Sequence, residues 1–570
     1  MQNTVPSIIS VQKYMNDHNL DALYIPKHDR FLNEYVQEKD DILRYVSHFS
    51  GSFGFCVITK DKGYLWVDGR YTLQAEQELD LTFWNILSYG QDSLSKFLKA
   101  KGIQKLAFDP YLVTVDQYKK WENDFENIKL IPLEEDWLKN IWQDRPKGHF
   151  NPVFSHDIEF SGMSAFEKTK ELASKINHPY LIHQLDSLCW LLNLRGGDIP
   201  FTPVFYGSGI LYPNSTVDLF IHNKDTSLDV LKSINDFITV YEFDDLKKVM
   251  ANLNNLLIHE ASTPYALTIQ NKDKFIPSND LIIPVKALKN SVEQKGMKDC
   301  HIEDAIAVIE TLYWLDNQDK ADLTECDVSD YLSEQRKKRK NFIQLSFETI
   351  AGSGPNGAII HYHATKDSNR CLKDDSLLLL DSGGQYFNGT TDVARTICIG
   401  KVTEEQIERY TDVLKGNIAL SSITFPKETS GSQLDVLARQ YLWKQGLDFK
   451  HGTGHGVGYC LNVHEKPQSI SKFGTYPLKA GMVVSNEPGF YKEQAFGIRL
   501  ENLELIKESR FADFLEFETL TLIPFDKRLI DVKSLTNSEK EWINKYNEKI
   551  KKSVMPYISN HCQNWLLNFI

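Results

Sequence analysis

The chain has 570 residues, enough for about three or four domains of ordinary size. Hydrophobic residues make up 42% and charged residues 25%, which is typical of a packed globular protein and excludes a disordered or fibrous one. Lys and Arg total 64 against 77 Asp and Glu, giving a net charge of −13 that repels phosphate backbones and anionic lipid. We therefore expect no nucleic-acid partner and no membrane partner.

The sequence predicts a cytoplasmic protein. Its apolar runs are far shorter than the roughly 20 residues of a membrane-spanning helix, and its first residues do not have the pattern of a signal peptide. Its eight cysteines never come closer than 26 positions, so no CxxC pair is present for zinc or redox chemistry. We expect these cysteines to be reduced and buried.

The first two domains are predicted to be of the α/β class. Residues 1–150 alternate short β-rich runs with helical stretches near 71–79 and 94–101, and a polar segment over 139–160 has the composition of a linker. A second α/β domain of similar length is predicted over 151–289, and its first helix is expected over 165–177. No residue-level repeat relates the two.

A third domain is predicted over 290–530, followed by a helical extension over 531–570. It opens with a long helix for which Ser291 is a candidate cap, and the final helix has Thr536 or Asn537 as its cap. Between them, residues 347–506 are rich in strands and glycine and contain most of the motifs with titratable residues.

Four segments of this third domain place acidic or imidazole residues at strand ends. Asp381 ends an apolar strand, and Asp392 starts the next strand after the Asn388-Gly389 hairpin signal. His455 lies in a run with glycine at every second position, which lets the imidazole approach a neighbour closely. Glu487 and Glu501 flank a loop centred near position 494.5, so they lie almost opposite each other across a hairpin.

A cation is needed where these residues meet. Glu501 has the same strand parity as Leu503 and Leu505, which directs its carboxylate toward an apolar side. Four carboxylates and one imidazole in one sheet, with few neighbouring basic residues, suit two divalent cations with oxygen and nitrogen ligands. The absence of thiolate ligands favours Mn²⁺, Co²⁺ or Zn²⁺ in a catalytic site.

The ordered contexts LDSGGQY, GTTDVART, HGTGHGVG, NEPGFY and GIRLEN resemble those of the pita-bread metallopeptidases, the methionine aminopeptidase and prolidase clan. The wider chain resembles the cytosolic three-domain aminopeptidase P branch, in VDGRYTLQAEQ, WLLNLRGGDIPFTPVF and LTLIPFDKRLIDVKSLT. This resemblance implies two accessory α/β creatinase-like domains before a pita-bread catalytic domain, and two divalent ions, most simply Mn²⁺.

The resemblance also implies a role for each candidate residue. Asp381 would chelate one ion, Asp392 and Glu501 would bridge both, and His455 would serve the second ion. Glu487 would link the pair and shuttle a proton as a catalytic residue. His464 would donate to the oxyanion, and His361 and His451 would line the substrate pocket, with His361 also catalytic. Tyr491 and Arg499 would orient the carboxylates by hydrogen bonds, and Arg70 would contact the substrate.

The implied activity is removal of one N-terminal residue from peptides with proline at the second position. A prolidase-type dipeptidase and a non-catalytic binding module on the same fold are the alternatives, although the complete ligand set disfavours the second. Gly352–Gly357 matches GxGxxG, but Pro355 and the run 358–363 predict a turn and a strand, so no dinucleotide site is expected. Apolar residues after 517 and the family resemblance favour a homodimer.

Overall fold

The computed structural model describes residues 7–222, 230, 236–366, 368–373 and 375–570. They form two compact units: one runs to Ser155 and resumes over Met163–Ile282, and the other combines His156–Gly162 with Ile283–Ile570. The division into four parts at 150, 289 and 530 stays a prediction. Among the described residues, no helix combines the length and the apolar character that crossing a bilayer requires.

The first unit contains two six-stranded sheets of the same topology. The first has the order β4-β3-β2-β1-β5-β6, and its strands are β1 (Ala22–Pro26), β2 (Phe55–Thr59), β3 (Gly63–Val67), β4 (Trp84–Ser88), β5 (Lys105–Phe108) and β6 (Lys129–Pro132). The second has the order β12-β11-β10-β8-β13-β14, and its strands are β8 (Tyr180–Ile182), β10 (Gly207–Leu211), β11 (Val217–Ile221), β12 (Ile238–Glu242), β13 (Leu256–Ile258) and β14 (Phe275–Pro277).

The two sheets also share the sequence of parallel and antiparallel pairings. Along each strand order, the second and third pairings are antiparallel and the other three are parallel. Helices accompany them at α1 (Ser7–Asp17), α2 (Ile42–Ser47), α3 (Thr72–Glu78), α4 (Leu94–Ala100), α5 (Val115–Asp124), α7 (Ala165–Ala173), α8 (Leu185–Leu192) and α10 (Leu246–Asn252). The α/β class predicted for both rounds is confirmed.

The second unit is built on four sheets. A three-stranded sheet contains β16 (Ile350–Ser353), β17 (Leu377–Ser382) and β20 (Val393–Cys398), and a second contains β15 (Phe342–Leu345), β18 (Gly384–Tyr386) and β19 (Gly389–Thr390). A six-stranded sheet has the order β21 (Thr424–Pro426), β28 (Phe514–Thr519), β27 (Asn502–Glu508), β24 (Val483–Asn486), β22 (Gly454–Gly456) and β23 (Glu465–Ile470). The hairpin β25 (Gly489–Lys492) and β26 (Phe496–Arg499) completes the set.

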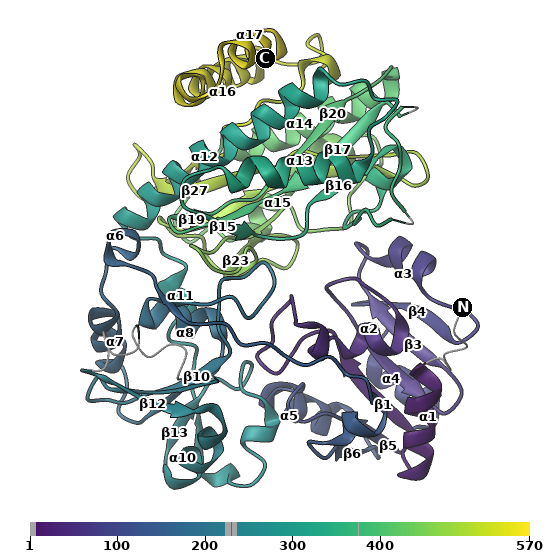
Figure 1. Cartoon of the computed structure of the whole chain (residues 1–570), viewed down its shortest axis with the longest axis vertical. Coiled ribbons are helices and arrows are strands. Elements are labelled where there is room, and N and C mark those ends of the chain that lie inside the picture. The colour runs from purple at the N-terminus through teal and green to yellow at the C-terminus, as the bar shows by residue number, and fades with distance from the viewer. Residues whose placement is uncertain (1–6, 223–229, 231–235, 367, 374) are drawn as a thin grey trace. The chain divides into compact units, whose positions relative to one another are not determined.

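Helices α12 (Ser291–Asp316), α13 (Glu325–Lys337), α14 (Glu404–Ser421) and α15 (Gly431–Trp443) pack on these sheets (Figure 1). Helix α16 (Asn537–Val554) packs against α12 and α14, and α17 (Asn560–Phe569) packs against α12. The long helix predicted after residue 290 is confirmed, but its cap is Asn290, whose side chain accepts from the backbone N–H groups of Val292 and Glu293. Ser291 is instead the first helical residue. Thr536 caps α16.

Two further predictions differ from the structure. Residues 359–363 form no strand, because a 3₁₀ turn over Gly354–Ala358 leads into irregular backbone. Cys371 is exposed and Cys326 is half-buried, whereas the other six cysteines are buried. The apolar residues after 517 that favoured a dimer pack within their own unit, since Leu522, Ile523 and Tyr546 belong to the core formed by α12–α14 and β16, β17 and β20.

Candidate metal centre

Four carboxylates lie at strand ends in the second unit. Asp381 lies in β17 and pairs with Ala394 of β20, and Asp392 immediately precedes β20. Asn486 pairs with Asn502 and Gly489 pairs with Arg499, so the same register sets Glu487 opposite Glu501. The observed hairpin centre is position 494, half a residue from the predicted one. Three different sheets thus bring acidic side chains to one place.

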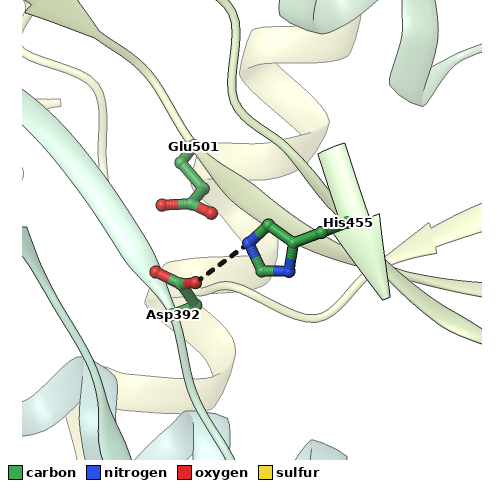
Figure 2. A group of neighbouring side chains, drawn as sticks. All are labelled: Asp392, His455 and Glu501. Atoms are coloured by element: carbon green, nitrogen blue, oxygen red, sulfur yellow. Dashed lines mark ion pairs between the residues drawn. The ribbon is translucent and has the colours of Figure 1, made fainter. Parts of the chain in front are cut away.

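Asp392, His455 and Glu501 form the tightest group (Figure 2). Each offers one ligand atom, and these three atoms lie within 4.8 Å of one another. His455 Nε2 is 3.4 Å from Asp392 Oδ2 and 3.6 Å from Glu487 Oε1, which brings a third carboxylate to the group. The side chains point toward one another from segments that are far apart in the sequence.

Local hydrogen bonding orients the His455 ring. Its Nδ1 is 2.9 Å from the Gly456 carbonyl oxygen, which can only accept, so Nδ1 has a proton and Nε2 is the ring nitrogen that faces the carboxylates and would bind a metal ion. The glycines around His455 let β22 approach its neighbouring strands. A Cβ atom at Gly454 would lie 1.9 Å from the Ser485 carbonyl oxygen, and one at Gly456 would lie 2.4 Å from that of Glu465. The predicted close approach is therefore one of backbone to backbone.

Burial and mutual repulsion perturb the acidic groups. Burial, followed by the charges of Asp392, Asp381 and Glu487, raises the pKa of Glu501 well above its usual range. Burial also raises the pKa of Asp381 to about 7 and raises that of Glu487, although Arg499 opposes the rise at Asp381. Burial would lower the pKa of His455, but its contacts with Asp392 and Glu487 raise it to about 9.

The residues present fit divalent cations. In the described part of the chain, Asp381 Oδ1 is buried without any hydrogen-bond partner, and an unsatisfied carboxylate oxygen in a protein interior is costly. The donor set is carboxylate oxygen and imidazole nitrogen, which suits Mn²⁺, Co²⁺ and Zn²⁺.

Arg499, which is 1% exposed, links several of the candidate residues. Its guanidinium donates to Asp381 Oδ2 at 2.8 Å, to the Tyr491 hydroxyl at 2.8 Å and to the Ile360 carbonyl at 3.1 Å. The Tyr491 hydroxyl lies 2.9 Å from His451 Nε2, while His451 Nδ1 lies 2.7 Å from the Gly452 carbonyl oxygen. The Tyr491 proton therefore goes to His451 Nε2.

The other predicted site residues are His464, His361 and Arg70. The His464 ring is perpendicular to that of His455, with centroids 4.3 Å apart. His361 follows Ile360, whose carbonyl is bound by Arg499, so its segment lies beside the centre. Arg70 belongs to the first unit, where its guanidinium donates to Asp68 at 2.8 Å, and its contact with substrate stays a prediction.

Several residues that hold these segments were not predicted from the sequence. Asn417 of α14 donates to the carbonyls of Asn486 and Leu500, which precede Glu487 and Glu501. Arg439 of α15 donates to the His451 carbonyl at 2.7 Å. Arg395 donates to the Glu501 carbonyl. The only sequence signal for them is a polar residue within an apolar strand or helix face, which does not reveal a partner.

Family models match most of the chain. Metallopeptidase family M24 matches residues 295–508, and the C-terminal region of peptidase M24 matches 513–569. The creatinase/prolidase N-terminal domain matches twice, over 8–141 and 144–293. The expected order of two accessory domains followed by a pita-bread catalytic domain is thereby confirmed.

Full-length relatives agree with these matches. A probable Xaa-Pro aminopeptidase P of Paracoccidioides brasiliensis is 36% identical, covering 99% of this chain and 98% of its own. The structure of X-prolyl aminopeptidase from Caenorhabditis elegans, described as a cytosolic enzyme with a di-nuclear active site, has a TM-score of 0.93 at 30% identity and covers 99% of this chain and 98% of its own. The prolidase of Pyrococcus horikoshii shares the fold over 63% of this chain and 99% of its own, with a TM-score of 0.51 at 23% identity. The chain belongs to metallopeptidase family M24 and, within it, to the Xaa-Pro aminopeptidase P proteins.

Proposed function

We propose that this chain is a metal-dependent aminopeptidase that hydrolyses the bond between the first residue of a peptide and a proline at the second position. The observation that supports it best is the meeting of Asp392, His455 and Glu501 within 4.8 Å, in a chain related over its full length to Xaa-Pro aminopeptidases. Asp381 and Glu487 complete the proposed ligand set.

The chain's own groups position the reactants and move the proton. Two bound divalent ions would supply Lewis acidity and bring the pKa of water toward neutrality. Glu487, whose carboxylate lies 3.6 Å from His455 Nε2, takes a proton from the attacking water and returns it to the proline nitrogen. His464 donates to the carbonyl oxygen as negative charge develops on it.

Proline selectivity follows from the leaving group. The Xaa-Pro bond is a tertiary amide without an N–H, so an ordinary aminopeptidase whose site requires that N–H as a donor does not accept it. A site that cleaves this bond needs a pocket shaped around the proline ring. In the proposal, His361 and His451 surround the proline ring and the scissile carbonyl. The contact between Tyr491 and His451 Nε2 holds that imidazole in one orientation.

The test uses two matched tripeptides. The purified protein with Mn²⁺ is expected to cleave Arg-Pro-Pro after its first residue and to leave Arg-Ala-Ala intact, and equal rates on both would contradict proline selectivity. Glu487→Gln is expected to lose most of its rate even if some metal remains bound, because an amide cannot relay a proton. A wild-type rate in that variant would remove Glu487 from the mechanism.

The alternatives predict different results in the same assays. A prolidase-type dipeptidase would cleave Xaa-Pro dipeptides and leave Xaa-Pro-Yaa peptides intact. A non-catalytic binding module would contain no stoichiometric divalent metal, which metal analysis of the purified protein detects.

Mn²⁺ is the proposed ion, and its effect on activity is to be compared with that of Co²⁺ and Zn²⁺ added to the metal-free protein. A cytoplasmic location accords with the description of the Caenorhabditis elegans relative as cytosolic. The proposal of a homodimer rests on family resemblance alone, since Tyr546 and its neighbours pack into the core of their own unit. Sedimentation is expected to give about twice 65.6 kDa, and a monomer at micromolar concentration would refute the dimer.

A further inference from the structure

Arg395 is a buried cation placed three residues after Asp392. It is 1% exposed, and within the described chain its hydrogen bonds go to neutral oxygen atoms instead of a carboxylate. A buried guanidinium is costly unless its donors are satisfied, and it is the side chain best suited to bind several oxygens at fixed angles. Its partners therefore indicate what it holds in place.

One set of partners surrounds the candidate ligand Glu501. Arg395 Nη1 donates to the Glu501 carbonyl, and Nη2 donates to Asn502 Oδ1 at 2.7 Å. The Glu501 N–H donates to the Ala394 carbonyl at 2.9 Å, so both backbone groups of Glu501 are bound to consecutive residues of β20. The strand that begins after Asp392 thus fixes the backbone of a second candidate ligand.

The other set of partners belongs to the segment that follows the last strand. Arg395 donates to the carbonyls of Ile523 and Pro524 at 2.6 and 3.1 Å, and to the Tyr546 hydroxyl at 2.9 Å. Its guanidinium also lies 4.3 Å from the centre of the Phe525 ring. Tyr546 in α16 is buried, and its hydroxyl in turn donates to the Ile523 carbonyl at 2.9 Å.

The position of Glu501 demands such support. It lies between the end of β26 at Arg499 and the start of β27 at Asn502, outside both strands, and its backbone is held by the bond from its own N–H to the Ala394 carbonyl and by the Arg395 guanidinium. Metal ligands must be held within about 0.5 Å of their productive geometry by surrounding groups. Deleting a group that holds a ligand typically costs about 10–100-fold in metal affinity or activity.

We infer that Arg395 and Tyr546 are positioning residues through which the C-terminal extension holds Glu501 for metal binding. This rests on the proposed function, because Glu501 is a ligand only if the centre binds metal. Helix α16 then has a role beyond covering the core. Removal of the Tyr546 hydroxyl changes the metal affinity of a centre whose ligands lie outside α16.

The test measures Mn²⁺ binding to the full chain by equilibrium dialysis and elemental analysis. Arg395→Lys retains the positive charge but loses the planar guanidinium that donates to several oxygens at once. We expect the dissociation constant of this variant for Mn²⁺ to rise about 10–100-fold. Tyr546→Phe retains the ring and loses only the hydroxyl, and we expect a rise near the lower end of that range. At saturating Mn²⁺ both variants are expected to recover wild-type kcat and KM, which a damaged substrate pocket would not allow.

Tyr410→Phe is the matched control. Tyr410 is buried in the same core, and its hydroxyl accepts from the Asp526 N–H at 3.0 Å without a hydrogen bond to Glu501 or its neighbours. It is expected to lower the unfolding temperature as Tyr546→Phe does, with Mn²⁺ affinity unchanged. If Arg395→Lys does not fold, the comparison of the two tyrosine variants decides.

The outcomes separate this inference from the proposed function. Wild-type Mn²⁺ affinity in Tyr546→Phe, or equal weakening in Tyr410→Phe, would overturn the positioning role while the proposed activity stands. A wild-type chain that takes up no divalent ion would overturn the proposed function, and the inference with it.

Discussion

Glu465 is the single acid of a buried ion triad. Its carboxylate is 2.8 Å from Lys286 Nζ and also contacts Lys289 Nζ, and all three side chains are no more than 1% exposed. With both lysines protonated the triad has a net charge of +1. Glu465→Gln raises that charge to +2, whereas Lys286→Met lowers it to zero.

The two variants are therefore expected to differ greatly in stability. Removing one partner of a buried ion pair costs about 3–5 kcal/mol, because the remaining charge is poorly compensated in a medium of low dielectric constant. The Glu293 carboxylate also acts on Lys289, but it contributes less than Glu465 does. For a unit of this size, that corresponds to a fall of about 10 °C in unfolding temperature. Lys286→Met leaves Lys289 and Glu465 paired, and we expect less than half of that fall.

Differential scanning calorimetry of the full chain measures both changes. Equal shifts in the two variants, or a larger one in Lys286→Met, would refute the charge balance described above. Glu465→Gln should also lower activity, since residue 465 pairs with Gly456 of β22 and directly follows His464. The expected defect is in kcat at saturating metal, because His464 is proposed to stabilise the oxyanion.

The remaining predictions concern His464, Glu325 and His183. His464→Ala is expected to lower kcat about 10²–10³-fold with metal content unchanged, as for loss of one oxyanion donor, and a change confined to KM would make it a binding residue. The Glu325 carboxylate accepts hydrogen bonds from the backbone N–H groups of Ser353 and Arg370 and from the Tyr362 hydroxyl, and these three residues surround the His361 segment. Glu325→Gln should therefore lower kcat/KM about tenfold, with Mn²⁺ content unchanged. Unchanged kcat/KM would show that the segment keeps its place without that carboxylate. Burial lowers the pKa of His183 from 6.5 to about 3. Below pH 6.5 this histidine therefore becomes protonated in the unfolded chain while it stays neutral in the folded chain. The stability contributed by neutral His183 is lost as pH falls, by up to about 1.4 kcal/mol per pH unit, and urea unfolding of His183→Gln should show a correspondingly shallower slope between pH 6.5 and 5. Parallel slopes in the two proteins would contradict the assigned pKa.

Features that depend on local patterns could be predicted from the amino-acid sequence. Hydrophobic alternation and turn residues were enough to predict two α/β rounds, the long helix after residue 290 and a hairpin centred within half a residue of its observed position. The five candidate ligands could be named for the same reason, since each occupies a recognisable strand end or glycine run. Their individual roles stay predictions.

Contacts between groups that are distant in the sequence could not be predicted in this way and are seen in the folded chain. Arg395 and Glu501 are 106 positions apart, Asp381 and Arg499 are 118 apart, and Lys286 and Glu465 are 179 apart. A hydrophobic period shows that a side chain is buried, but it does not show which opposite charge or carbonyl compensates it. The same limit applies to the residues after 517: the sequence shows that they need an apolar surface to cover, and the fold shows that Tyr546 and its neighbours cover the core of their own unit. The physical reason is that hydrophobic burial is non-directional, whereas ion pairs and hydrogen bonds require atoms to lie within about 3 Å, a distance that only the packed chain sets.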